Sequence, residues 1–168
     1  MEKFRSTDGP LAPGLRGFRV IPALGFICLI SLFAAGCATR PAAIGPDDPL
    51  FGTWVNERHD MPGNPFFAKK VISPDGQELD FDHLADTEPS RECRNTIEKV
   101  WIDARGNHWY RIHVIGWQYT DRELKMERFA LCRVDARGAV LEQLNAKFDY
   151  PKELSTSDVN YAVYYKSE

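Results

Sequence analysis

The 168-residue chain lacks the sequence signatures of the common catalytic and metal-binding classes. It has four cysteines but no Cys-x-x-Cys pair, and no closely paired histidines that could share a metal ion. No serine or cysteine lies in a nucleophile-elbow or catalytic-cysteine context, and no glycine-rich loop is present to hold a phosphate. We therefore expect no enzymatic activity, no cofactor and no bound metal.

Excess positive charge is also missing. The 21 lysines and arginines are outnumbered by 24 aspartates and glutamates, which gives a formal net charge of −3 at pH 7. Because nucleic-acid binding depends mainly on a basic surface, this balance argues against a nucleic-acid partner.

An apolar run at residues 20–36 follows a basic start. Small residues crowd the end of the run. A basic start, an apolar middle and small residues at the end are typical of a secretory signal peptide. We therefore predict that residues 1–36 are a signal peptide that is removed on export. The basic residues before the run are Lys3, Arg5, Arg16 and Arg19.

The run ends in Ala34-Ala35-Gly36-Cys37, which resembles the lipobox of bacterial lipoproteins. In that family the signal is cut just before the cysteine, whose thiol carries diacylglycerol, with palmitate among the acyl chains. Two or more acyl chains hold a protein stably on a bilayer. The resemblance implies an acylated Cys37 on the periplasmic face of an outer membrane, because Ala38 stands where aspartate often signals inner-membrane retention. The alternative is an ordinary signal anchor in which Cys37 is incidental.

The folded part of the chain contains two cysteines, Cys93 and Cys132. Because an exported protein meets an oxidising compartment, we expect these two to form a disulfide. It would close a loop of about 40 residues and contribute roughly 3–4 kcal/mol to stability. A metal site is the competing interpretation, but no further ligands of matching spacing accompany the two thiols.

Residues 50–168 are predicted to form one all-β domain, and the proline-rich residues 37–49 a flexible tether to the membrane. Eight runs rich in Val, Ile, Phe, Tyr, Trp and Thr are separated mostly by short turns that contain Gly or Pro. Eight antiparallel strands in up-and-down order can close into a barrel, which removes exposed strand edges. We therefore predict a single antiparallel eight-stranded up-and-down barrel. The predicted strands are residues 50–57, 66–73, 77–84, 94–103, 108–117, 124–135, 139–148 and 160–166.

One of these runs allows a second interpretation. Thr120 and Glu123 fit a helical capping box, so residues 120–131 could instead form a short helix. Arg128 also interrupts the alternation expected of a strand, because it is in phase with the apolar Met126.

Gly52-Thr53-Trp54 lies at the start of the first predicted strand and resembles the Gly-x-Trp signature of lipocalins and related calycins. In that family the glycine permits a close backbone turn, and the tryptophan plugs the closed end of the barrel. A basic residue on the last strand usually covers the tryptophan, and Lys166 is the candidate here. The wider pattern over residues 50–166 is similar to bacterial lipocalin-like proteins of unknown function. The resemblance implies a barrel that binds a small apolar or amphipathic ligand.

Aromatic side chains are the candidates for lining such a ligand site. Those that we single out are Trp109, Tyr110, Trp117 and Tyr164. Among polar residues, Asp80 and Asp82 share one strand face and could form an acid pair or hold a metal ion near His83. His59 and Asp60 lie in a predicted turn. His108 and His113 are an odd number of residues apart, so a strand places them on opposite faces.

Three functions remain open from the sequence. The leading interpretation is a membrane-anchored, lipocalin-like protein that binds a small apolar or amphipathic ligand in the bacterial cell envelope. The alternative is an envelope protein-binding module, an inhibitor or assembly factor, with a filled barrel. An enzyme on a calycin barrel comes third. An open apolar cavity would favour the first, and a filled barrel the second.

Overall fold

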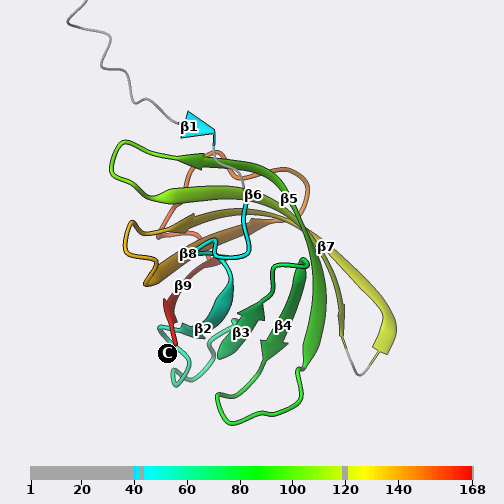
Figure 1. Cartoon of the computed structure of the whole chain (residues 1–168). Helices are drawn as coiled ribbons and strands as arrows, with labels where there is room; N and C mark the ends of the chain where they lie inside the picture. Colours follow the sequence, from blue (N-terminus) through cyan, green and yellow to red (C-terminus); the bar gives the residue numbers. More distant parts are fainter. Residues whose placement is uncertain (1–39, 42–43, 119–120, 168) are drawn as a thin grey trace, which may run out of the picture. The chain divides into compact units, whose positions relative to one another are not determined.

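The computed structural model describes residues 40–41, 44–118 and 121–167 (Figure 1). All regular elements among them are β-strands, so no described residue belongs to a helix that could span a membrane. The predicted signal peptide and Cys37 lie outside the described residues. The strands are β1 (Arg40–Pro41), β2 (Gly52–Asn56), β3 (Lys69–Ile72), β4 (Gln77–Phe81), β5 (Arg91–Ile102), β6 (His108–Gln118), β7 (Asp121–Val134), β8 (Val140–Ala146) and β9 (Tyr161–Lys166).

Strands β2 to β9 follow one another around a closed barrel (Figure 1). Each strand pairs antiparallel with the next in the chain, and β9 returns to pair with β2. The short β1 lies outside this ring, on the edge of β5. The prediction of an eight-stranded antiparallel up-and-down barrel is confirmed.

The helical alternative for residues 120–131 is wrong, because strand β7 begins at Asp121. Its backbone pairs with β6 on one side and with β8 on the other. Arg128, which interrupts the alternation, lines the inside of the barrel together with Met126. The barrel interior is polar at this level, which explains how it accommodates an arginine.

The connections between strands divide the barrel into two ends. Tight turns join β3 to β4, β5 to β6 and β7 to β8 at one end, which we call the hairpin end. In the last two turns Asp103 and Asp135 accept hydrogen bonds from backbone N–H groups, while Gly106 and Gly138 adopt φ angles of 84° and 72°. These residues belong to the repeated Asp-Ala-Arg-Gly stretches, which therefore encode turns. The longer connections at the other end, the loop end, are residues 57–68, 82–90 and 147–160.

The strands differ greatly in length. Strands β5, β6 and β7 have 12, 11 and 14 residues, whereas β2, β3 and β4 have 5, 4 and 5. Strand β5 therefore runs past β4, whose pairing with it ends opposite Arg94. After one further hydrogen bond, from the Asn95 N–H to the Gly76 oxygen, no strand of the described residues pairs with this edge of β5 until β1, with Arg40 opposite Ile102 and Pro41 opposite Trp101.

Part of the predicted flexible tether, residues 37–49, folds onto the barrel. Besides β1, the turn that precedes β2 packs at the hairpin end, where Asp48 is buried. Its carboxylate accepts hydrogen bonds from the Tyr110 hydroxyl at 2.6 Å and from the backbone N–H of Leu50 at 3.0 Å. The prediction that the whole segment is a flexible tether is therefore wrong. The buried hydroxyl of Tyr110 requires a hydrogen-bond partner, and Asp48 in this segment supplies it.

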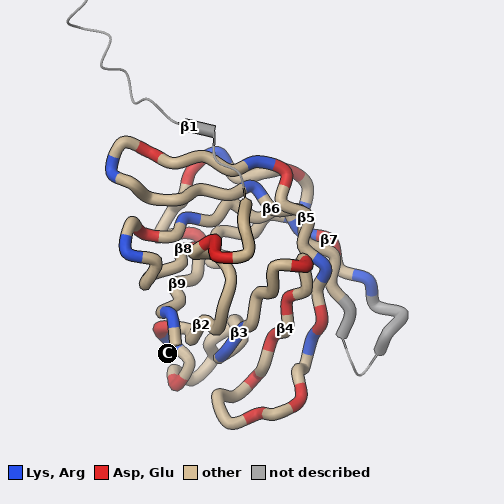
Figure 2. Tube along the Cα trace, viewed as in Figure 1, with Lys and Arg blue, Asp and Glu red and all other residues tan. Residues whose placement is uncertain are grey.

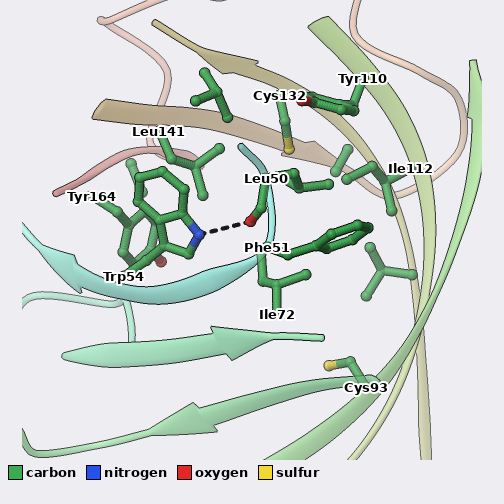
Figure 3. Packing of buried hydrophobic residues seen from close by; sticks show 14 residues of the cluster. Leu50, Phe51, Trp54, Ile72, Cys93, Tyr110, Ile112, Cys132, Leu141 and Tyr164 are labelled. Atoms are coloured by element: carbon green, nitrogen blue, oxygen red, sulfur yellow. Dashed lines mark hydrogen bonds between the residues drawn. The ribbon is translucent and has the colours of Figure 1, made fainter. Parts of the chain in front are cut away.

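The interior of the barrel consists of two layers. The layer at the hairpin end is apolar and is built around Trp54 and Tyr110, both fully buried (Figure 3). The polar layer beside it carries charged and amide side chains, and the two layers meet where Lys70 pairs with Trp54 across β2 and β3. The apolar layer contains Leu50, Phe51, Trp54, Ile72, Cys93, Tyr110, Ile112, Val114, Ala130, Cys132, Val134, Leu141, Ala162 and Tyr164.

Candidate functional site

The polar layer is organised around four charged side chains from three adjacent strands. Lys70 on β3 lies between the two carboxylates of β4, with its Nζ 2.9 Å from Glu78 Oε1 and 3.9 Å from Asp80 Oδ1. Arg91 on β5 donates to Asp80 Oδ2 through Nε at 2.7 Å. Strand alternation turns these positions inward, and the β3–β4 register sets Lys70 directly opposite Asp80. We call these four residues the charge network.

Amide side chains add hydrogen bonds to the charge network, while Asp80 Oδ1 accepts none and has only Lys70 Nζ at 3.9 Å. Lys70 Nζ donates to Gln143 Oε1 at 2.8 Å, and Asn95 Nδ2 donates to Glu78 Oε2 at 2.7 Å. Two cations and two carboxylates therefore neutralise one another inside the barrel. Buried charges are tolerated in proteins when they are paired and hydrogen-bonded in this way.

The charge network shifts the pKa values of its members. Burial and then the nearby Glu78 carboxylate raise the pKa of Asp80 above its ordinary range. Burial also acts to raise the pKa of Glu78, but the attraction of Lys70 and the Asn95 hydrogen bond outweigh it and lower that pKa. Burial acts to lower the pKa of Lys70, yet the field of Glu78 outweighs it and raises the pKa. Lys70 and Glu78 are therefore charged at neutral pH.

A metal ion does not fit this network. The ligand atoms of Glu78, Asp80 and Cys93 lie within 4.8 Å of one another, which is the spacing of a metal-binding cluster. However, Lys70 and Arg91 each already bind one oxygen of a carboxylate, Glu78 Oε1 and Asp80 Oδ2, and these two cations would repel a metal ion. Burial and repulsion by Glu78 also raise the pKa of the Cys93 thiol, which opposes formation of the thiolate that a metal requires.

Asp80 and Asp82, which the sequence suggested as an acid pair on one strand face, do not lie together. Strand β4 ends at Phe81, and Asp82 is exposed in the loop that follows while Asp80 is fully buried. The acidic partner of Asp80 is Glu78, two residues earlier on the same face.

The histidines considered from the sequence lie apart from the charge network. The Nδ1 of His59 is 3.0 Å from the backbone oxygen of Asn56 in a turn at the loop end. His113 lies on the outer face of β6, where its Nε2 is 2.7 Å from Glu127 and its ring stacks on Phe129. His108 is close to the inward-facing Tyr110, with ring centroids 6.5 Å apart.

The chamber left inside the polar layer is small. Its volume is about 30 Å³, and it is lined by charged and amide side chains together with a few apolar ones. This is room for one or two water molecules rather than for an organic ligand. The lining residues are Glu78, Arg91, Cys93, Val114, Gly116, Met126, Arg128, Gln143 and Asn145.

Trp54, Gly52 and Lys166 form a compact group at the hairpin end. Trp54 is 0% exposed, and its indole Nε1 donates to the backbone oxygen of Leu50 at 2.9 Å. Lys166 pairs with Trp54 across β2 and β9, and its Nζ lies 5.1 Å from the indole centroid. The same Nζ donates to the backbone oxygen of Phe51 at 2.8 Å. Gly52 has a φ of 134°, and a Cβ there would come within 2.9 Å of the Lys166 side chain.

A larger groove lies at the loop end, where the segments after β2 and before β9 meet. It has a volume of about 440 Å³, within the range of small-molecule sites. One side chain of the groove, Phe66, packs against the apolar layer, whereas another, Val159, is 80% exposed. We call this feature the rim groove. It is lined by Asn56, Glu57, Arg58, Pro65, Phe66, Thr156, Asp158, Val159, Tyr161, Ala162 and Val163.

The aromatic residues singled out as ligand candidates do not converge on one site. Tyr110 and Tyr164 face inward but are packed in the core, with Lys70 Nζ 4.7 Å from the Tyr164 ring. Trp109 lies on the outer face of β6 and stacks on Trp101 of β5. The side chain of Trp117 lies outside the described residues. Alternation along β6 separates Trp109 from Tyr110, which the sequence pattern already placed on opposite faces of the strand.

The expected disulfide is absent, since Cys93 and Cys132 are both free and buried. Cys93 pairs with Gly116 of β6, whereas Cys132 pairs with Tyr110 of the same strand. Six residues of β6 separate those two positions, on the order of 20 Å of extended chain. A disulfide requires Cα atoms about 4.4–6.8 Å apart. The two thiols also lie well apart in Figure 3.

Comparison of the chain with models of known protein families, with curated proteins and with solved structures found no match. The lipobox and Gly-x-Trp resemblances therefore stay predictions that rest on the motifs themselves.

The charge network and the rim groove are the features that sequence reasoning missed. Lys70, Glu78 and Asp80 were visible as charges within predicted strands, and their spacing of two on β4 was a usable signal. Their role as a buried ion network depends on the β3–β4 register, which brings Lys70 opposite Asp80. No sequence pattern marks the rim groove, because it is formed by two loops that are distant in the chain.

Proposed function

We propose that this chain is a lipid-anchored, lipocalin-like protein of the bacterial cell envelope that binds a small amphipathic molecule in the rim groove. The envelope location rests on the predicted signal peptide and the lipobox-like residues 34–37. The lipocalin-like assignment is supported by the closed barrel and by the Trp54–Lys166 contact at its hairpin end.

The observation that carries the proposal is the contrast between the barrel interior and its rim. The interior chamber holds about 30 Å³, whereas the rim groove holds about 440 Å³. The groove combines apolar side chains such as Phe66 and Val159 with charged ones such as Arg58 and Asp158. Such a lining suits a molecule with one apolar and one polar part. Among the described residues, the larger space for a ligand is therefore at the mouth of the barrel.

Native mass spectrometry of the protein extracted from envelopes tests this proposal. We expect a co-purifying small molecule in the wild type, and about tenfold weaker retention in Val159→Asp. Loss of one valine contact and addition of a charge near an apolar group cost roughly 1–2 kcal/mol. Because Val159 is 80% exposed, the variant should keep its melting temperature.

Phe148→Asp is the matched control, since Phe148 is 84% exposed in the same connection but does not line the groove. It should retain the molecule as the wild type does. Equal retention in Val159→Asp, or an empty wild-type protein, would contradict the proposal.

Lipidation yields a separate prediction. Replacing Cys37 by Ser removes the thiol that would accept diacylglycerol. We expect the variant to lose its lipid label and to accumulate as an uncleaved precursor. Fractionation and mass spectrometry of the N-terminal peptide measure both effects, and an unaltered membrane fraction with intact labelling would refute the lipobox interpretation.

A second candidate function, a protein-binding module, is favoured by the filled interior together with apolar side chains exposed at the loop end. Phe148, Val159 and Met61 are the clearest of these. A photo-reactive amino acid at position 148 should then give a defined protein adduct in intact cells. Small-molecule retention without any adduct would favour the rim groove.

A further inference from the structure

Strand β1 fixes the start of the described chain at one place on the barrel. It pairs with the last two residues of β5, where that strand has run past β4. Cys37 precedes Arg40 by three residues, and three residues of chain span at most about 11 Å. An acyl group on Cys37 would therefore lie close to the tip of the β5–β6 hairpin, whatever path residues 38 and 39 take.

The outer face of this hairpin carries a pair of tryptophans. Trp101 and Trp109 are direct cross-strand partners, with ring centroids 5.8 Å apart and an angle of 11° between the planes. Lys99 Nζ lies 5.5 Å from the Trp101 ring, and the Arg133 guanidinium lies 5.4 Å from the Trp109 ring. Both indoles are half-buried. Tryptophan is enriched at the headgroup level of membranes, because its ring is amphipathic.

The two ends of β5 differ in charge (Figure 2). Near the hairpin tip the chain carries three cations, Lys99, Arg105 and Arg111, and two carboxylates, Glu98 and Asp103. Asp103 is also saturated by hydrogen bonds, including one of 2.9 Å from Trp109 Nε1. At the other end, the loop of residues 82–90 contains three carboxylates and no lysine or arginine. These carboxylates belong to Asp82, Asp86 and Glu88.

An anionic bilayer attracts the hairpin tip of β5 more strongly than the acidic loop at its other end. Each lysine or arginine held near its surface contributes about 1 kcal/mol, whereas carboxylates are repelled. The full length of β5, on the order of 35 Å, separates the acidic loop from the hairpin tip. This distance exceeds the Debye length of about 8 Å at physiological ionic strength, so the two ends respond to the surface independently.

We propose that the β5–β6 hairpin, with Trp101 and Trp109 at its outer face, docks on an anionic phospholipid bilayer. In this orientation the rim groove points away from the membrane, whereas Lys152 and Glu153 of the β8–β9 connection, which line one pocket with the two tryptophans, lie beside the docked face. The inference rests on the proposed acylation of Cys37. It adds a defined orientation: the barrel lies against the bilayer rather than hanging from a long tether.

Depth-dependent quenching tests the orientation. The exposed, uncharged residues Ala104, at the hairpin tip, and Thr87, in the acidic loop, are each replaced by cysteine in the full-length gene. The label attaches to the new cysteine, because Cys93 and Cys132 are buried and Cys37 is acylated. The purified proteins are labelled with a fluorophore and reconstituted into vesicles of phosphatidylethanolamine and phosphatidylglycerol that contain doxyl lipids.

We expect quenching at position 104 to exceed quenching at position 87 several-fold. Adding Lys99→Glu and Arg105→Glu should reduce the quenching at position 104 at least about twofold, since both cations would become repulsive. Bound, acylated protein with equal quenching at both positions, or stronger quenching at position 87, would overturn the docking proposal alone. Absence of the lipid on Cys37 by mass spectrometry would overturn the lipid-anchored function as well.

Discussion

Trp54→Ala should lower the free energy of unfolding by about 3–5 kcal/mol, the cost typical of emptying a buried tryptophan site. The indole is fully buried between β2 and β9, and it satisfies the backbone oxygen of Leu50. Its loss also removes the ring over which Lys166 lies. Because domains of this kind are stable by only about 5–15 kcal/mol, the variant should lose a large share of its stability and unfold at a much lower denaturant concentration.

Urea denaturation followed by circular dichroism measures this effect. Trp101→Ala is the matched control, because Trp101 is a half-buried indole on the outer face of the same barrel. It should cost less than half as much. If Trp54→Ala kept wild-type stability, the indole would not be plugging the barrel, and the lipocalin-like interpretation would lose its main structural support.

The second large effect is expected from Lys70→Met, which removes the central cation of the charge network. Glu78 and Asp80 would then face one another in the interior, and Arg91 would be the remaining cation of the charge network. Breaking a buried ion pair from one side typically costs about 3–5 kcal/mol. Lys69→Met is the control, because Lys69 is the neighbouring residue on the opposite face and donates to backbone oxygens of the loop, including that of Asp86. It should cost about 1 kcal/mol.

The pH dependence separates lost charge pairing from lost packing in Lys70→Met. In the wild type Lys70 lowers the pKa of Glu78, so this stabilisation is present above the ordinary glutamate pKa and is lost as the pH falls. In the variant, burial and mutual repulsion raise the pKa values of both carboxylates, so stability is lost as the pH rises. The difference between the two proteins should therefore be largest near pH 7 and shrink toward about pH 4. A difference that does not vary with pH would mean that packing alone is responsible.

The barrel was predictable because its turns and strands are each encoded by residues that are adjacent in the sequence. Turns such as Asp103–Gly106 are encoded by adjacent residues, and runs of β-branched and aromatic residues lie between them. Strands joined by tight turns pair with their chain neighbours, so eight of them in sequence give an up-and-down order. The closing pairing of β2 with β9 then follows from the need to cover two free edges.

The interior was not predictable, because local alternation is misleading on β4. Leu79 and Phe81 are the apolar residues of that strand, yet Glu78 and Asp80 face inward. The outer side of Phe81 is covered by Lys69, whose Nζ lies 4.2 Å from the ring. Only the register with β3, which brings Lys70 opposite Asp80, makes the inward carboxylates stable.

The disulfide expectation failed for a related reason. Composition and compartment can indicate that two cysteines are oxidised, but they carry no information on register. Cys93 and Cys132 both face the interior, and their separation is set by how far along β6 each one is paired. The segment before β2 was similarly misjudged from its prolines, since the burial of Asp48 depends on Tyr110, a residue much later in the chain.

The closure of the barrel by its last strand has a consequence for the order in which the chain can fold. Lys166 and Phe51 share a hydrogen bond although 115 residues separate them, and β9 also supplies the neighbour that covers Trp54. Contacts between such distant residues form late, because the entropy of closing the intervening chain must first be overcome. A nascent chain that lacks β9 therefore cannot bury its tryptophan or seal β2 against β8. Such a chain therefore stays open until β9 has been synthesised.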